Sequence, residues 1–116
     1  MQPLAIHISY TDIDRITQGD SHVTKDLLNV FIKQNLENAD RLKEYFASGE
    51  WDLLRKSAHK LKSSLALVGL AEHRLMAERL ERTAGDDAAD TKRMVNDLAS
   101  VILLVVAEFA EKVKTL

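Results

Sequence analysis

The sequence predicts an all-α protein: an antiparallel up-down four-helix bundle with a short additional N-terminal helix. Three observations lead to this fold class. The 116 residues include only four glycines and one proline, so few residues interrupt a helix. Leu, Ala, Glu, Lys, Arg and Asp dominate each segment, and these residues favour helices. The glycines divide the chain into helix-length segments joined by short links, which favours antiparallel neighbours.

The first two helices are predicted from their end signals. A short helix over residues 11–18 begins at Thr11-Asp12-Ile13-Asp14, which resembles a capping box, and stops at Gly19. Asp20 or Ser21 then caps a long second helix that ends at Gly49. Apolar residues recur along this second helix every three or four positions, as on one face of a helix.

Three further helices follow the same logic. They are expected over residues 50–67, 71–84 and 90–113, and the first two of them stop at Gly69 and Gly85. The N-cap of the last is one of Asp86, Asp87 and Asp90. We expect the four long helices to form the bundle and the short first helix to cover one end of it.

The last helix is apolar nearly all round between residues 98 and 107, whereas a helix in a small bundle normally has one apolar face. Two interpretations follow. In the favoured one the first helix covers the second face, because Leu4, Ile6, Ile8 and Ile13 need somewhere to pack. In the other the face is a dimer or partner surface. The oligomeric state stays open, with a monomer slightly favoured.

Composition and charge exclude several classes of protein. The net charge of −2 gives no broad positive field for nucleic acid, and there is no cysteine for disulfide or thiolate chemistry. No apolar run approaches the roughly 20 residues that span a bilayer, and no signal peptide is visible. We therefore expect one cytoplasmic domain over residues 1–116, with no membrane insertion and no nucleic-acid partner.

One histidine in the third predicted helix points away from the core. At about 100° per residue, the apolar residues of this helix share one direction and His59 lies about 140° from it. Four residues share its outer face. They are Arg55, Lys62, Ser63 and Ala66.

This arrangement suits a nucleophile for a phosphoryl group. A neutral imidazole attacks phosphorus through a ring nitrogen, and neighbouring cations stabilise the charge on the equatorial oxygens. The small residues Ser63 and Ala66 leave room for another protein to approach. No Walker loop or glycine-rich fingerprint for ATP is present, and no histidine or carboxylate spacing for a metal site. On geometry alone, an exposed histidine beside lysines is more often an ordinary solvated residue.

The motif around His59 adds a second line of inference. Ala58-His59-Lys60-Leu61-Lys62-Ser63-Ser64, followed by Gly69-Leu70, resembles the signature of histidine-containing phosphotransfer (HPt) domains. Ser63 stands where that family more often has Gly, but it is still small. Phe31, the segment Gly49–Asp52 and Leu80-Glu81 extend the resemblance to roughly residues 11–110.

The resemblance implies a set of roles. His59 would be the phospho-acceptor, Lys62 would stabilise the phosphoryl group, and Ser63 would give clearance or a hydrogen bond. Gly69 would be structural and let the chain turn after the helix. The second and third helices would dock a response-regulator receiver domain. The residues expected on that docking face are Arg55, Lys56, Lys60, Ala66 and Phe31.

The function implied is a phosphocarrier in a multistep two-component phosphorelay. It would carry a phosphoryl group between receiver aspartates, with a receiver domain or hybrid histidine kinase as partner and no ATP-dependent kinase activity. It would need no cofactor or metal, since Mg²⁺ would lie in the receiver. The alternative is a helical adaptor that binds a receiver without phosphotransfer. The chain could also be a domain of a larger hybrid kinase. The sequence does not specify the cognate partners, the signal or the direction of phosphate flow.

Overall fold

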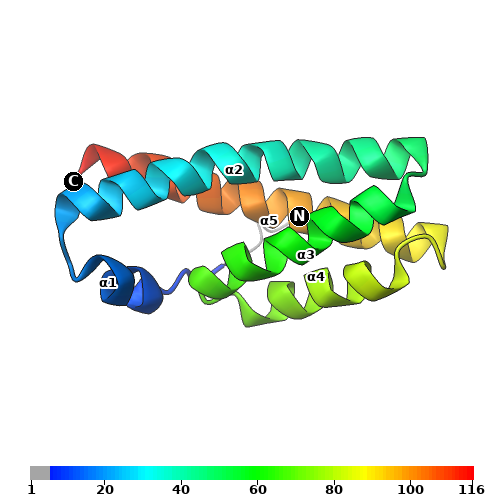
Figure 1. The fold of residues 1–116 in the computed structure, drawn as a ribbon, viewed down its shortest axis with the longest axis horizontal. Coiled ribbons are helices and arrows are strands. Elements are labelled where there is room, and N and C mark those ends of the chain that lie inside the picture. Colours follow the sequence, from blue (N-terminus) through cyan, green and yellow to red (C-terminus); the bar gives the residue numbers. More distant parts are fainter. Residues whose placement is uncertain (1–5) are drawn as a thin grey trace.

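The computed structural model describes residues 6–116, and across them the chain forms five α-helices and no β-strand (Figure 1). The helices are α1 (Thr11–Thr17), α2 (Ser21–Ser48), α3 (Trp51–Leu67), α4 (Ala71–Thr83) and α5 (Ala88–Lys114). The all-α prediction is confirmed. No helix in this part of the chain is both long enough and apolar enough to cross a bilayer.

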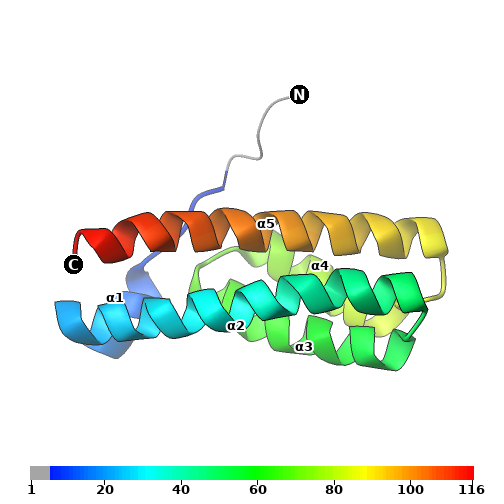
Figure 2. The same cartoon turned by 90° about the horizontal axis from the view of Figure 1, so that it is seen from above.

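The two longest helices, α2 and α5, lie side by side along the length of the molecule (Figures 1 and 2). α3 packs against α2 and α4, and α4 packs against α5. The chain reverses direction at each connection between these four helices (Figure 1). Fully buried leucines from all four meet in one core. They include Leu28, Leu42, Leu61, Leu80 and Leu98.

The two helix caps that the acidic residues predict are present. The Asp20 side chain accepts a hydrogen bond of 2.9 Å from the Val23 amide at the start of α2. Asp87 accepts one of 3.0 Å from the Asp90 amide, so α5 begins at Ala88, two residues earlier than predicted. At the other end of α2, Gly49 has a φ of +68°, the left-handed conformation that closes many helices.

The capping box predicted at Thr11 is wrong. Thr11 is the first residue of α1, and the N-cap is Tyr10, which makes no side-chain capping bond. Instead, Ser9 Oγ accepts a bond of 3.3 Å from the Thr11 amide. The reason is a contact outside the helix: the Ser9 amide bonds to the Val68 carbonyl at 2.9 Å, which fixes how the chain enters α1.

The second apolar face of α5 is not covered by α1 as predicted, because α1 packs chiefly against α2. Residues 6–10 reach α5 instead. The Tyr10 hydroxyl donates a 2.6 Å hydrogen bond to Glu108, and its ring contacts Phe109. Ile13 is fully buried and Ile6 and Ile8 pack at the edge of the core, whereas Leu4 lies outside the described residues. Two α5 residues, Leu103 and Leu104, remain 44% and 38% exposed.

One end of the bundle is fastened around Trp51, the first residue of α3. Its ring packs against Phe46 of α2, with centroids 5.9 Å apart. It also lies so close to Gly85, in the α4–α5 turn, that a Cβ there would be 2.8 Å from the ring. Trp51 therefore ties the turn before α3 to the turn after α4.

Candidate functional site

α3 presents His59 to solvent, as its position in the sequence predicts. The side chains that face the core, among them Leu54, Ala58, Leu61 and Leu65, are fully buried. On the opposite face the His59 side chain is 66% exposed. The burial of one face thus fixes the direction of the other, and α3 holds the imidazole outward on a rigid element.

Glu81 of α4 bridges His59 and Lys62. One carboxylate oxygen, Oε1, lies 2.8 Å from His59 Nδ1, and the other, Oε2, lies 2.6 Å from Lys62 Nζ. Oε2 is shielded from solvent. The contact with Lys62 lowers the pKa of Glu81 most and the bond with His59 lowers it further, against the opposing effect of burial. Glu81 is therefore ionised at neutral pH.

The Glu81 carboxylate determines which ring nitrogen of His59 is free. An ionised carboxylate accepts hydrogen bonds and cannot donate one, so Nδ1 carries the proton in this contact. In the neutral ring the lone pair then belongs to Nε2. Nε2 is thus the nitrogen available to attack an electrophile.

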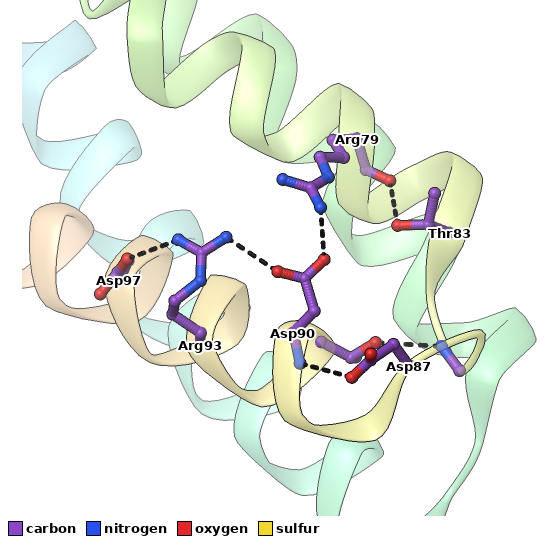
Figure 3. Close-up of polar contacts among 8 residues, drawn as sticks. Arg79, Thr83, Asp87, Asp90, Arg93 and Asp97 are labelled. Atoms are coloured by element: carbon purple, nitrogen blue, oxygen red, sulfur yellow. Dashed lines mark hydrogen bonds and ion pairs between the residues drawn. The ribbon is translucent and has the colours of Figure 1, made fainter.

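Ion pairs at the α4–α5 corner join α4 to α5. Arg79, two residues before Glu81, bonds to Asp90 of α5 at 2.6 Å, and Arg93 bonds to the other oxygen of Asp90 at 2.8 Å (Figure 3). Arg93 also pairs with Asp97 at 3.7 Å. Arg79 and Glu81 therefore have separate partners: Arg79 bonds to α5, and Glu81 bonds to α3.

Of the four basic residues of α3 named from the sequence, Arg55, Lys56, Lys60 and Lys62, only two are free of an ion pair among the described residues. Arg55 is bonded to Asp52 at 3.1 Å and to the Ala84 carbonyl at 3.0 Å, so it fastens the α4–α5 turn to α3. Lys62 is paired with Glu81. Lys56 and Lys60 are exposed and make no ion pair within residues 6–116. These two lysines line a shallow hollow beside His59, between α3 and α4.

The small residues predicted beyond His59 lie at the surface, and Ser63 lines two hollows between α2 and α3. The first hollow is bounded by polar side chains. They are Gln34, Glu37, Asn38, Arg41, Lys60, Ser63 and Ser64. The second has a more apolar wall. It is bounded by Leu27, Val30, Phe31, Gln34, Ser63, Ser64 and Leu67. Ala66 is exposed on the following turn of α3.

Phe31 lies beneath this face rather than on it. It is 4% exposed, and its ring packs edge-on against Phe109 of α5 with centroids 4.9 Å apart. It therefore shapes the floor of the apolar hollow from the core side.

Gly69 lies in the α3–α4 turn with a φ of +73°, a backbone conformation that glycine adopts without strain.

Sequence reasoning missed the contact between Glu81 and His59. The two residues are 22 positions apart on different helices, so helical spacing within α3 does not reveal it. The available signal was the Leu80-Glu81 pair, which resembles part of the HPt pattern.

Within residues 6–116 no group of three or more possible metal ligands comes together.

The fold and the site together define a class of protein: a helical bundle that presents one oriented histidine to solvent. The family model described as Hpt domain matches residues 26–112, and the chain belongs to this family. The match includes His59, Lys62 and Glu81. No curated protein and no solved structure gave a match. Membership implies involvement in phosphorelay histidine phosphotransfer, in which Hpt domains interact with receiver domains and histidine kinases.

Proposed function

We propose that the chain is a histidine phosphotransfer protein of a multistep two-component phosphorelay, carrying a phosphoryl group on His59 between receiver-domain aspartates. The observation that supports this most directly is the state of the imidazole: exposed, bonded through Nδ1 and free at Nε2. The proposal takes residues 1–116 as one Hpt domain with an up-down four-helix scaffold, acting in the cytoplasm.

In the proposed reaction the Nε2 lone pair of His59 attacks the phosphorus of a receiver aspartyl phosphate. The bond from phosphorus to the aspartate oxygen breaks, and the carboxylate leaves with its electron pair. Lys62, one turn along α3, stabilises charge on the equatorial oxygens. Ser63 is small and lies at the surface, which gives the receiver clearance and a hydroxyl for a hydrogen bond. The reverse sequence returns the group to an aspartate.

The docking face in this proposal combines a basic rim with apolar hollows. Lys56 and Lys60 are exposed beside His59 and attract the acidic active site of a receiver, with Arg55 contributing at the edge. Val30, 52% exposed, and Ala66 supply apolar contacts across α2 and α3, above Phe31. In this proposal the Mg²⁺ needed for the reaction lies in the receiver.

Labelling with a phosphorylated receiver domain tests the proposal. We expect the radioactive phosphoryl group to move from the receiver to this chain and to be released by acid. His59→Gln should abolish the label, while His73→Gln, a variant on α4, should keep it. Label on the His59→Gln protein would refute the assignment of His59. Binding of the receiver without transfer would instead favour the adaptor function.

A further inference from the structure

The bridging carboxylate of Glu81 has a consequence for the phosphorylated state, and this consequence rests on the proposed function. Lys62 fixes the carboxylate through the shielded oxygen Oε2 at 2.6 Å, so Oε1 stays aimed at His59 Nδ1. The phosphoryl group would be added at Nε2, on the other side of the ring. The contact at Nδ1 can therefore persist when the histidine is phosphorylated.

We infer that Glu81 is a positioning residue that keeps Nδ1 of His59 protonated while Nε2 carries the phosphoryl group, and so keeps the phosphohistidine reactive. Attack by the Nε2 lone pair forms the N–P bond without removing the Nδ1 proton. The ring then carries a positive charge, which the Glu81 carboxylate balances at 2.8 Å.

The retained proton matters for onward transfer. When a receiver carboxylate oxygen attacks phosphorus, the P–Nε2 bond breaks and its electron pair returns to Nε2. With the proton still on Nδ1, the leaving group is a neutral imidazole. If the proton had been lost, the leaving group would be an imidazolate anion, which leaves far less readily. Glu81 thus removes the need to recapture a proton before each transfer.

No other charged group around His59 among the described residues can accept the Nδ1 hydrogen bond as Glu81 does. On α3 the neighbours are cations: Arg55, Lys56, Lys60 and Lys62. Across the groove on α2, Glu37 pairs with Arg41 at 4.0 Å. Among the described residues, Glu81 is the one carboxylate bonded to the ring.

The test measures the lifetime of phosphohistidine in the full chain. A background with His7→Gln, His22→Gln and His73→Gln leaves His59 as the one histidine, and phosphoramidate then phosphorylates it chemically without any receiver. Loss of the group is followed by ³¹P NMR from about pH 5 to about pH 9, a range that brackets the usual titration of imidazole. Glu81→Gln is isosteric and removes only the charge. Glu78→Gln, one turn earlier on α4, is the matched control.

We expect loss of the phosphoryl group at about pH 9, above the usual titration of imidazole, to be about tenfold slower with Glu81→Gln, the ratio expected when a charged hydrogen-bond acceptor becomes neutral. The pH at which the rate of loss is half its value at low pH should fall by about one unit in Glu81→Gln. The ¹⁵N shifts of unphosphorylated His59 should also show a smaller share of the Nδ1–H tautomer. Glu78→Gln should leave all three unchanged. Equal lifetimes and equal pH profiles for Glu81→Gln and the parent would overturn the inference. Failure of a receiver to label the chain would count against the proposed function instead, because chemical phosphorylation does not depend on it.

Discussion

Ser9 occupies the space that a side chain on Gly69 would need. A Cβ built on Gly69 would lie 2.7 Å from Ser9 Cβ, closer than two such carbons approach, and the Ser9 amide bonds to the neighbouring Val68 carbonyl at 2.9 Å. The glycine of the motif therefore has two structural roles. It allows a φ of +73° after α3, and it lets the N-terminal segment cross the α3–α4 turn.

Gly69→Ala should destabilise the protein by about 2 to 4 kcal/mol, the sum of left-handed strain and overpacking. Gly19→Ala is the matched control, because Gly19 has the same φ of +73° but nothing lies within 4 Å of the place a Cβ would occupy. We expect that control to cost only about 1 kcal/mol, from strain alone. Urea unfolding followed by circular dichroism measures both. Equal losses in the two variants would show that the Ser9 contact does not matter.

Val30→Asp should slow phosphoryl transfer from a receiver about tenfold, because it places a carboxylate on the face proposed to meet an acidic partner. Leu103→Asp is the control: Leu103 has a similar exposure, 44% against 52%, but lies on α5. The rate of labelling at limiting receiver concentration measures the effect. A slower rate with Leu103→Asp and an unchanged rate with Val30→Asp would move the docking face to α5.

Asn35→Leu should stabilise the protein by about 1 to 2 kcal/mol. Asn35 is 1% exposed on α2. Its Nδ2 donates to the Phe31 carbonyl at 2.9 Å, but its Oδ1 is buried without a hydrogen-bond partner. Leucine has a similar volume and no polar atom to desolvate. Asn29→Leu, on the exposed side of α2, should change the free energy of unfolding by less than about 0.5 kcal/mol. A loss of stability in Asn35→Leu would mean that the amide has a partner, such as a buried water.

Tyr10 should make stability depend on alkaline pH. Burial raises the pKa of Tyr10 most, and the hydrogen bond to Glu108 and the charge of Glu108 raise it further. A pKa raised on folding gives stability that is fully present below the unfolded value of about 10 and is lost as the pH rises through the folded value. The stability advantage of the parent over Tyr10→Phe should therefore shrink above pH about 10. Chemical unfolding at several pH values measures it, with Tyr45→Phe as the control. A constant difference across this range would contradict the expectation.

The helix ends show why much of the fold follows from local sequence. Asp20, Asp87 and Gly49 act within one turn of themselves, so their positions alone predict where helices begin and end. The Thr11 capping box failed because Ser9, upstream of the helix, accepts the bond from the Thr11 amide and its own amide is fixed by Val68. That arrangement depends on where the end of α3 lies in space, which no local pattern specifies.

In the site, too, local sequence predicts some features, and the packing between helices determines the others. The outward direction of His59 follows from the periodicity of α3, because the buried stripe is readable in one helix. The partner of its Nδ1 depends on the packing of α4 against α3, which periodicity within one helix does not specify. Phe31 shows the converse. Its place in the motif put it at the docking face, but the contact with Phe109 draws it into the core.

The position of Trp51 gives the protein a built-in optical reporter. It is the sole tryptophan of the chain, and it begins the same helix that presents His59 eight residues later, about 12 Å along the axis. Its ring senses both the α2–α3 and the α4–α5 turns through Phe46 and Gly85. Emission from this one fluorophore can therefore follow receiver docking and phosphorylation in real time, with no dye attached to the surface that the partner must approach.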